Sequence, residues 1–577
     1  MLNTPAERRA VLGSRYPRWQ SRTLSQFLDV VAAVHAERPL VITDERTFSY
    51  RDIRDWSAAL AAGLRAAGIR AGEHVALLMA NYPEYVAAKF ALARVGAVAV
   101  PINFHLLAGE MGYVLAQSDS VALITMARFR DRDYLADLDL LVPNWEHRPF
   151  GLGKLRRVFV MAPTRRGVST LDDLRAMGAA NAEATRAEGN ARSHPDPHAV
   201  SDILYTSGTT GGPKGVMLTH DMVLRTAYAS ALTRAFEDGR RILFAAPMYH
   251  AHGYVECLVA CLFVGGAIIP QARFDAAAML VAAERHQANE IGGVPTLTIQ
   301  LVRAARQRGF DSAHLTQVFN TGGFNTPAIW EDIREYLRPR EIVTAYGMTE
   351  TTASTTCTLP EGPPERLLTS NGRLKQAGVA GAGQADGVLA RYKSIDPETG
   401  ADLPCGEPGE LLVRGPIVTR GYYNKPAETR AAFTPDGWLH TGDLGRIDAQ
   451  GYLTLLGRLK ESFRCGGEMV LPREIEEVLE THPAVAAAVV VGLPDALMGE
   501  VGCACVVPRS NPTPAAAELL SFCHGRLARF KVPKFVLWMR EEEIPRTVTG
   551  RPRKAPLAAI ARSRLALSNP DTGGPTR

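Results

Sequence analysis

The sequence lacks any apolar run long enough to span a bilayer. The longest, Cys257 to Pro270, contains two glycines and stops short of the roughly twenty residues that a transmembrane helix needs. The first residues, MLNTPAERRAVLGSRYPRW, have no apolar core of a secretory signal. We therefore expect a cytoplasmic protein without a transmembrane segment, for which peripheral contact with a membrane stays open.

The net charge is small, and the cysteines are few. The formal net charge is +5 over 577 residues, which is too small to indicate a nucleic-acid partner. The eight cysteines form no CxxC pair, and no histidines lie at zinc-finger spacing from a cysteine pair. These absences argue against a zinc site and a disulfide framework, and they favour reduced, mostly buried thiols.

Alternating helix and strand patterns occupy much of the chain. Ser49 begins a helical pattern that ends near Gly68, and a buried strand is expected over Val75–Met79. Asn81 with Glu84 forms a capping-box pattern before a helix that ends near residue 96, and a strand follows over 97–100. This rhythm predicts an α/β fold, with a large N-terminal domain of parallel-rich sheets packed with helices.

A change of pattern over residues 458–467 predicts a domain boundary. Beyond it come a helix from Pro472, the strands AAAVVVG and CACVVP, a helix from Ala515 and the strand FVLWM, which suffice for a small α+β domain. We predict a large domain over 25–459 and a small domain over 460–564. Residues 1–24 are expected to form a partly disordered arm and 565–577 a disordered tail.

A loop rich in glycine and hydroxyls lies within DILYTSGTTGGPKGV, which begins at Asp202. Its backbone N–H groups and hydroxyls suit a phosphate, and Lys214 adds positive charge. The Walker A pattern GxxxxGK[ST] is missing, and the β-rich GVMLTH that follows predicts a loop between two strands. The candidate phosphate contacts are Thr206, Ser207, Gly208, Thr209, Thr210 and Gly211.

The string YTSGTTGGPKGV resembles the signature of the adenylate-forming superfamily, which holds acyl-CoA synthetases, adenylation domains and luciferases. Other motifs of that family follow in order: PMYHAHG from Pro247, NTGGFNTP from Asn320, AYGMTETT from Ala345, GELLVRGP from Gly409, GYYNKPAET from Gly421, DGWLHTGDLG from Asp436, GYLTLLGRLK from Gly451 and GGEMVLPREIE from Gly466. The likeness is greatest to fatty-acid and aryl-acid CoA ligases. It implies a β-barrel-like subdomain beside the parallel-rich sheets and a mobile C-terminal domain.

The resemblance also implies a site for ATP and Mg²⁺. The implied nucleoside contacts are Tyr346 stacked on adenine, Gly322, Gly323, Phe324 and Gly347 around the base, and Asp443 and Arg458 on the ribose. Thr349 would donate to the α-phosphate, while Glu350 and Thr206 would hold the magnesium ion. Lys214 and Lys460 are implied as further catalytic residues, with Lys460 at the hinge between the two domains.

The acid pocket is implied to lie near His250, Tyr254, Val294 and Met348. Most residues around it are apolar or small and no fixed cation stands out, so an acid with an apolar or aromatic body is expected. Coenzyme A is the implied co-substrate, and the Gly466–Gly467–Glu468 loop would line its tunnel.

One departure from the family lies near the C-terminus. The family ends in PRTxTGK, whose lysine bridges the substrate carboxylate and the α-phosphate, whereas this chain reads IPRTVTGRPRK from Ile544. Three interpretations stay open. Arg551 takes the role of the lysine, since guanidinium binds phosphate well; Lys554 reaches in instead; or the first half-reaction is slow or altered.

The leading hypothesis is an AMP-forming acid–thiol ligase that converts a fatty, alicyclic or aryl acid to an acyl-adenylate and then to an acyl-CoA. A related ligase with a carrier protein or an amine as acceptor, or with an unusual acid such as nitrite, is the first alternative. A nucleotide-binding protein without turnover is the second. We expect a monomer or homodimer with no nucleic-acid partner.

Overall fold

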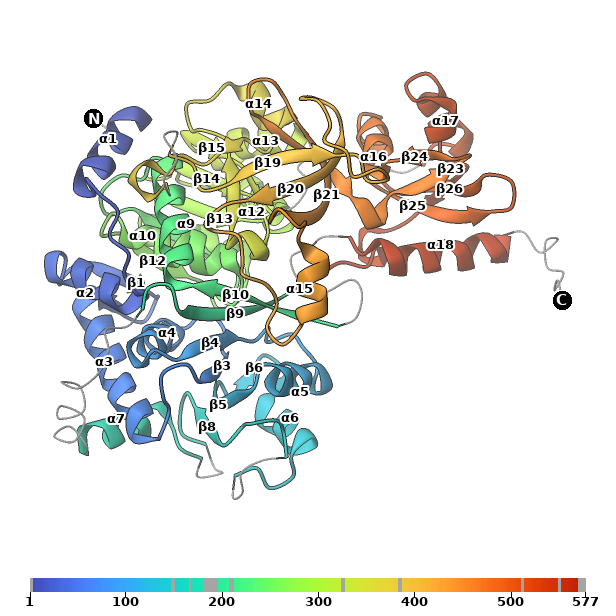
Figure 1. Ribbon diagram of the computed structural model, residues 1–577. Helices are drawn as coiled ribbons and strands as arrows, with labels where there is room; N and C mark the ends of the chain where they lie inside the picture. Colours follow the sequence, from blue (N-terminus) through green and yellow to red (C-terminus); the bar gives the residue numbers. More distant parts are fainter. Residues whose placement is uncertain are drawn as a thin grey trace.

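The computed structural model describes residues 4–146, 151–164, 168–180, 196–206, 212–322, 327–381, 387–509, 513–547, 550 and 552–568. Two parallel-rich sheets form the centre of the large domain, and a smaller domain projects to one side of it (Figure 1). In the described part of the chain, no helix is both long and apolar enough to cross a membrane.

The first large-domain sheet has six strands, of which only the β10–β9 pair is antiparallel. Its order is β10 (Lys214–Thr219), β9 (Val200–Thr206), β4 (Val98–Pro101), β3 (His74–Leu78), β5 (Ser120–Thr125) and β8 (Arg157–Val160). The strand pair β9–β10 confirms that the glycine-rich loop joins two strands, with Thr206 directly opposite Lys214.

The second sheet has seven strands, all parallel apart from the β1–β2 pair. Its order is β15 (Glu341–Val343), β14 (Gln317–Asn320), β13 (Glu290–Gly293), β11 (Arg241–Phe244), β12 (Ala267–Pro270), β1 (Pro39–Ile42) and β2 (Thr47–Ser49). Ligands of open parallel sheets bind beyond the carboxyl ends of the strands, so the segments after β11, β13 and β14 are where a site is expected.

Helices pack around these two sheets. They are α1 (Pro5–Arg15), α2 (Leu24–Val34), α3 (Tyr50–Ala66), α4 (Pro83–Val95), α5 (Ala108–Gln117), α6 (Tyr134–Leu141), α7 (Leu171–Ala180), α9 (His220–Thr233), α10 (Ala260–Leu262), α11 (Ala276–Arg285), α12 (Pro295–Arg308), α13 (Pro327–Asp332) and α14 (Pro364–Thr369), with the π-helices η1 (His252–Val259) and η2 (Ile333–Leu337). The predicted α/β class is confirmed.

Local sequence explains the ends of α3 but not the start of α4. Ser49 caps α3 in a reciprocal box with Asp52, as predicted. Asn81 does not cap α4: its amide donates to the carbonyls of Ala246 (3.0 Å) and Gln271 (3.2 Å), and its oxygen accepts from Met248 N–H (2.8 Å). These long-range bonds replace the local cap and tie the end of β3 to the segments after β11 and β12.

The barrel-like part of the large domain is built from two antiparallel sheets. One contains β16 (Ala345–Gly347), β17 (Ser354–Cys357) and β18 (Arg373–Leu374), and the other β19 (Arg391–Ile395), β20 (Gly409–Arg414), β21 (Leu439–Ile447) and β22 (Leu453–Arg458). The short elements η3 (Thr349–Thr351), η4 (Gly378–Ala380) and α15 (Pro426–Ala432) lie in its connections, and β6 (Arg128–Phe129) pairs with β7 (Arg132–Asp133) elsewhere.

The small domain packs helices on a five-stranded sheet of its own. Its strands are β24 (Glu468–Val470), β23 (Phe463–Cys465), β26 (Gly499–Pro508), β25 (Val485–Asp495) and β27 (Phe535–Trp538), and its helices are η5 (Leu459–Glu461), α16 (Pro472–Glu480), α17 (Ala516–His524), η6 (Arg529–Lys531), η7 (Glu541–Glu543) and α18 (Lys554–Ser568). The helices and strands match those expected after Pro472. In Figure 1, α18 runs beneath β25.

Both predicted chain ends need correction within the described residues. Before residue 25 the sequence predicts a partly disordered arm, yet Pro5–Arg15 form α1, with Leu12 buried and the Arg8 side chain donating to the Ala235 carbonyl (2.6 Å). At the other end, α18 continues past residue 564 to Ser568, because Leu557 and Ala561 on one helical face pack under β25. Single buried contacts of this kind carry little signal in sequence.

Candidate active site

Tyr346, Asp443 and Arg458 form one hydrogen-bonded group. The Tyr346 hydroxyl donates to Asp443 Oδ2 (2.6 Å), and Arg458 Nε lies 2.7 Å from Asp443 Oδ1. Register places Asp443 of β21 directly opposite Arg458 of β22, while Tyr346 comes from β16. The residues predicted for adenine and ribose are therefore brought together.

Electrostatics hold Asp443 and Arg458 as an ion pair. Burial alone would lower the pKa of Arg458, but the neighbouring anionic groups together, with Asp443 contributing most, outweigh burial and raise it. The pKa of Tyr346 is well above its usual value because the ring is buried and its hydroxyl faces the Asp443 carboxylate. Tyr346 thus stays a neutral donor at physiological pH.

A second group joins Lys214 to Glu350 through a tyrosine. The Tyr422 hydroxyl donates to Glu350 Oε1 (3.0 Å), and Lys214 Nζ lies 4.8 Å from the centroid of the Tyr422 ring. Thr206 is the register partner of Lys214. Burial raises the pKa of Glu350, whose ionisation also responds to the charges of Arg458 and Asp443. The two groups therefore lie within electrostatic reach of each other.

Tyr422 is a residue that motif reasoning missed. It lies within GYYNKPAET, but only the structure shows that this segment pairs with β10: Val216 bridges Tyr422, and Tyr423 N–H donates to the Gly215 carbonyl (2.8 Å). The local sequence pattern does not reveal which distant residue an aromatic side chain in a turn contacts.

The donors near Glu350 fit a magnesium ion held together with a nucleotide. The single buried carboxylate of Glu350 is too little for an all-protein cage, but Mg²⁺ is usually bound through one or two carboxylates and takes its other ligands from phosphates and water. Among the described residues no cluster of three histidine, cysteine or acidic side chains could hold a metal alone.

Close backbone approaches explain two glycines of the site. A Cβ on Gly347 would stand 2.2 Å from the Ala353 carbonyl oxygen, so a side chain there would push apart the strands that carry Tyr346. Gly322 has φ +88° and its Cβ position lies 3.3 Å from Val294. Gly322 and Val294, predicted for the base and the acid, are thus neighbours. Thr349 is the first residue of the short helix η3 and directly precedes Glu350.

The predicted acid-pocket residues are only partly brought together. Burial lowers the pKa of His250 to about 4, so its ring is neutral. Tyr254 lies in the core, where its hydroxyl donates to Asp202 (3.2 Å) and its ring lies beneath Lys89. Met348 packs against the cluster of Ala390, Val413, Val418 and Leu439. Tyr254 therefore serves the packing between η1 and β9.

Some predicted residues lie outside the described part of the chain. They are Ser207, Gly208, Thr209, Thr210, Gly211, Gly323, Phe324 and Arg551. Lys554, the alternative to Arg551, is committed elsewhere: its Nζ donates to Glu476 Oε1 (2.7 Å) on α16. The interpretation in which Lys554 reaches into the site is therefore not supported.

The small domain contacts the large one next to a residue predicted for the acid pocket. A Cβ on Gly550 would stand 2.2 Å from Thr296 Cγ2, two residues after Val294. Lys460 lies in η5 where the domains join, and Gly466 and Gly467 form the β23–β24 turn with positive φ, 62° and 90°. Gly466 N–H donates to the Met498 carbonyl (2.8 Å), and Glu468 is exposed at the start of β24.

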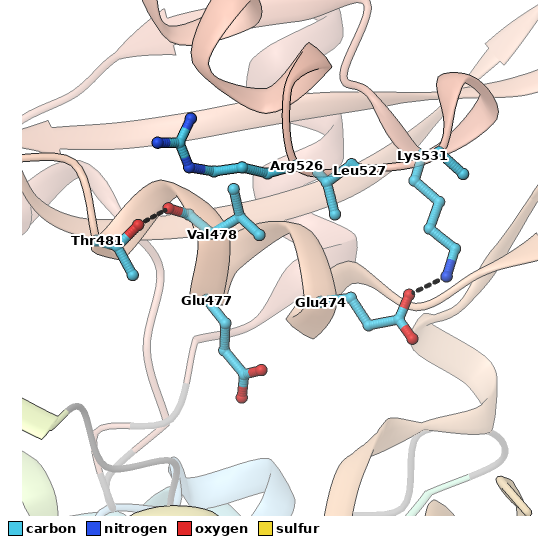
Figure 2. Close-up of a pocket in the computed structure, with 8 residues that line it drawn as sticks. Glu474, Glu477, Val478, Thr481, Arg526, Leu527 and Lys531 are labelled. Carbon is cyan, nitrogen blue, oxygen red and sulfur yellow. Dashed lines mark hydrogen bonds and ion pairs between the residues drawn. The ribbon is translucent and has the colours of Figure 1, made fainter.

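A groove lies away from these groups, on the small domain. It has a volume of about 610 Å³ and is lined by Glu474, Glu477, Val478, Thr481, Arg526, Leu527, Ala528 and Lys531 (Figure 2). Lys531 Nζ donates to Glu474 (2.6 Å) across it. None of its lining residues belongs to the predicted site.

Comparison with known proteins agrees with this geometry. The model of the AMP-binding enzyme family matches residues 28–423, and that of the AMP-binding enzyme C-terminal domain matches 474–551. The chain belongs to the AMP-binding enzyme family.

Named relatives and solved structures are similar over nearly their whole length. A putative acyl-CoA synthetase, YngI of Bacillus subtilis, is 32% identical over 92% of this chain and 96% of its own. The 3-[(3aS,4S,7aS)-7a-methyl-1,5-dioxo-octahydro-1H-inden-4-yl]propanoyl:CoA ligase of Mycobacterium tuberculosis is 32% identical over 93% and 99%. The ATP-bound structure of MatB from Rhodopseudomonas palustris is 26% identical over 93% and 99%, with a TM-score of 0.77.

Proposed function

We propose that the protein joins a carboxylic acid to coenzyme A in two half-reactions. In the first, a carboxylate oxygen attacks the α-phosphorus of ATP, the bond to the bridging oxygen breaks, and pyrophosphate leaves. In the second, the sulfur of coenzyme A attacks the acyl carbon, its proton passes to solvent, and AMP leaves with the electron pair of the acyl–oxygen bond. Both steps conserve atoms and charge without a further reactant.

The observation that carries this proposal is the pairing of a nucleoside group with a phosphate group. Tyr346, Asp443 and Arg458 offer an aromatic face and a carboxylate for the ribose. Glu350 lies within their electrostatic reach, and Tyr422 links it to Lys214. All reacting groups are anionic, so Lys214 and hydroxyl or N–H donors would stabilise the transition state. Glu350 and Thr206 would hold Mg²⁺, which supplies further positive charge on the phosphates.

Arg551 is proposed as the cation that bridges the acid and the α-phosphate. The contact of Gly550 with Thr296 supports it, because Gly550 directly precedes Arg551 and Thr296 lies beside the predicted pocket. Lys460 would be the hinge for the second half-reaction, and Gly466, Gly467 and Glu468 would then face pantetheine.

The acid is proposed to be fatty, alicyclic or aryl. The proposed acceptor is coenzyme A rather than a carrier protein, and the proposed location of the protein is the cytoplasm. The names of the relatives support an alicyclic or acyl-CoA product. The buried, uncharged surroundings of Val294 and Met348 favour an apolar body.

Pyrophosphate release with Mg-ATP and a panel of fatty, alicyclic and aryl acids, with and without coenzyme A, tests the proposal. Release that needs an acid, with acyl-CoA formed when coenzyme A is present, is expected. Arg551→Ala should lose release, while Arg551→Lys should retain it. Asp443→Asn should raise the KM for ATP, since the ribose contact is weakened. No release with any acid, with nucleotide still bound, would instead favour a protein without turnover.

A further inference from the structure

The segment between β11 and η1 holds two polar atoms without partners. Tyr249 Oη and His252 Nε2 are both buried, and neither has a hydrogen-bond partner among the described residues. Buried polar atoms are nearly always paired, because an unpaired one loses its hydrogen bonds to water without replacement. Two such atoms within four residues, at the carboxyl edge of the parallel sheet, indicate a place where a ligand supplies the missing partners.

His252 is held rigidly in this place. Its ring stacks on Phe319 of β14, with centroids 5.4 Å apart and planes 10° from parallel. It is the first residue of the π-helix η1, and such helices are frequent at functional sites. Burial lowers the pKa of His252 to about 4, so the ring is neutral and each nitrogen is either a donor or an acceptor.

Space for a ligand atom faces His252 Nε2. A Cβ added to Gly292 would stand 3.4 Å from Nε2, 3.4 Å from Cys257 Sγ and 3.6 Å from Phe244 Cβ, which are ordinary contact distances. A carbon-sized volume is therefore open there. Gly292 lies opposite Phe319 in the sheet register and two residues before Val294, so this volume adjoins the predicted acid pocket.

We infer that the acid carries a hydrogen-bonding oxygen, as a ketone or hydroxyl, on its apolar body, and that His252 Nε2 binds this oxygen in the space beside Gly292. The inference rests on the proposed function and narrows its substrate class. An acid without the oxygen would leave Nε2 unpaired, and a site built for a hydrogen bond discriminates strongly against such an analogue. We expect a preference of about tenfold or more.

Matched acid pairs test the inference on the full-length protein. The pairs are 3-(4-oxocyclohexyl)propanoate with 3-cyclohexylpropanoate, 3-(4-hydroxyphenyl)propanoate with 3-phenylpropanoate, and 8-hydroxyoctanoate with octanoate. Binding by calorimetry and kcat/KM for pyrophosphate release are both measured. At least one oxygenated acid should be preferred, and the preference should fall to near unity in His252→Phe. His252→Gln, which keeps a hydrogen-bonding group, should restore part of it.

A second variant keeps the test independent of the folding of His252→Phe. Gly292→Ala leaves His252 in place and fills the facing space with a methyl group, so it should also remove the preference. His482→Phe is the matched control, because His482 likewise packs on a phenylalanine, Phe522, but in the small domain. It should leave the preference unchanged.

The outcomes separate this inference from the proposed function. Any of three results overturns the inference, whether or not pyrophosphate is released. Both members of every pair bind equally, none of the acids binds, or the preference survives both His252→Phe and Gly292→Ala. A preference seen in binding without pyrophosphate release supports the inference and contradicts the proposed function.

Discussion

Glu256 in the large domain and Glu480 in the small domain are both buried carboxylates, yet their pKa values move in opposite directions. Burial would raise the pKa of Glu256, but Lys375 and Arg234 outweigh it and bring the pKa to about 2. Burial also raises the pKa of Glu480, and there it prevails, giving a pKa of about 7. Burial alone therefore does not decide the charge of a carboxylate.

The number of cations per carboxylate explains the difference. Glu256 has Lys375 Nζ at 2.8 Å, Arg234 at 3.6 Å and the hydroxyls of Ser230 and Ser354. Among the described residues, the cation paired with Glu480 is Arg473, at 3.2 Å, and the Ala488 backbone also donates a hydrogen bond to this carboxylate.

Arg473 is also shared with other acids on α16. Its Nε lies 3.1 Å from Glu477, and its NH1 lies 3.8 Å from Glu476. The same helix presents Glu474 and Glu477 to the groove of Figure 2. One guanidinium among several carboxylates cannot keep all of them ionised at low cost.

Lys375→Met should have the largest effect. It would leave Glu256 buried beside Arg234 alone, and breaking a buried ion pair from one side costs about 3–5 kcal/mol. The expected result is a loss of that size in the free energy of unfolding of the large domain, measured by denaturant titration.

Lys393→Met is the matched control for this experiment. Lys393 pairs with Asp402 at 2.7 Å, but both side chains are accessible to solvent, so its loss should cost at most about 1 kcal/mol. Similar losses for Lys375→Met and Lys393→Met would show that burial does not strengthen the Glu256 pair.

Glu480→Gln should have an intermediate and pH-dependent effect. The folded carboxyl titrates at about 7 and the unfolded one at 4.5, so between these values the folded state binds a proton that the unfolded state lacks. Stability of the small domain should fall as pH rises through this window, by about 3 kcal/mol in total, and stay level above it. Glu480→Gln should remove this fall and stabilise the domain at pH 8, as measured by calorimetry from pH 5 to 8.

Glu477→Gln provides the comparison within the same helix. Its side chain is 60% exposed, so the fall in stability between pH 5 and 7 should persist in this variant. A wild-type protein whose small domain gains stability over that range would contradict the assignment of a protonated Glu480.

A feature could be predicted from the sequence where it depends on neighbouring residues in the chain. The β9–β10 loop, the Ser49 cap and the helix from Pro472 follow from nearby residues, and all three were predictable. Family motifs predicted the group of Tyr346, Asp443 and Arg458. They did not predict the direct hydrogen bonds within this group.

Residues that act over long sequence separations escaped prediction. Asn81 bonds to segments more than 160 residues away, Lys375 meets Glu256 across 119 positions, and Tyr422 meets Glu350 across 72. Such pairs have no periodic or local signal, because their partners are chosen by packing of the whole domain. The Arg8 contact that orders α1 is of the same kind.

Tyr422→Phe should have the smallest effect, and it concerns a third kind of buried carboxylate. Glu350 has a raised pKa like Glu480, but its contact from Tyr422 is a neutral hydroxyl. Loss of one such hydrogen bond is worth about 1 kcal/mol, so pyrophosphate release should fall about fivefold, with more Mg²⁺ needed for half-maximal rate. Tyr423→Phe is the matched control, because the Tyr423 hydroxyl bonds to Asp119 (3.0 Å) and should leave the Mg²⁺ dependence unchanged. If Tyr422→Phe also leaves the Mg²⁺ dependence unchanged, contacts other than Tyr422 hold Glu350. In its environment Glu350 would then resemble Glu480 more closely than Glu256.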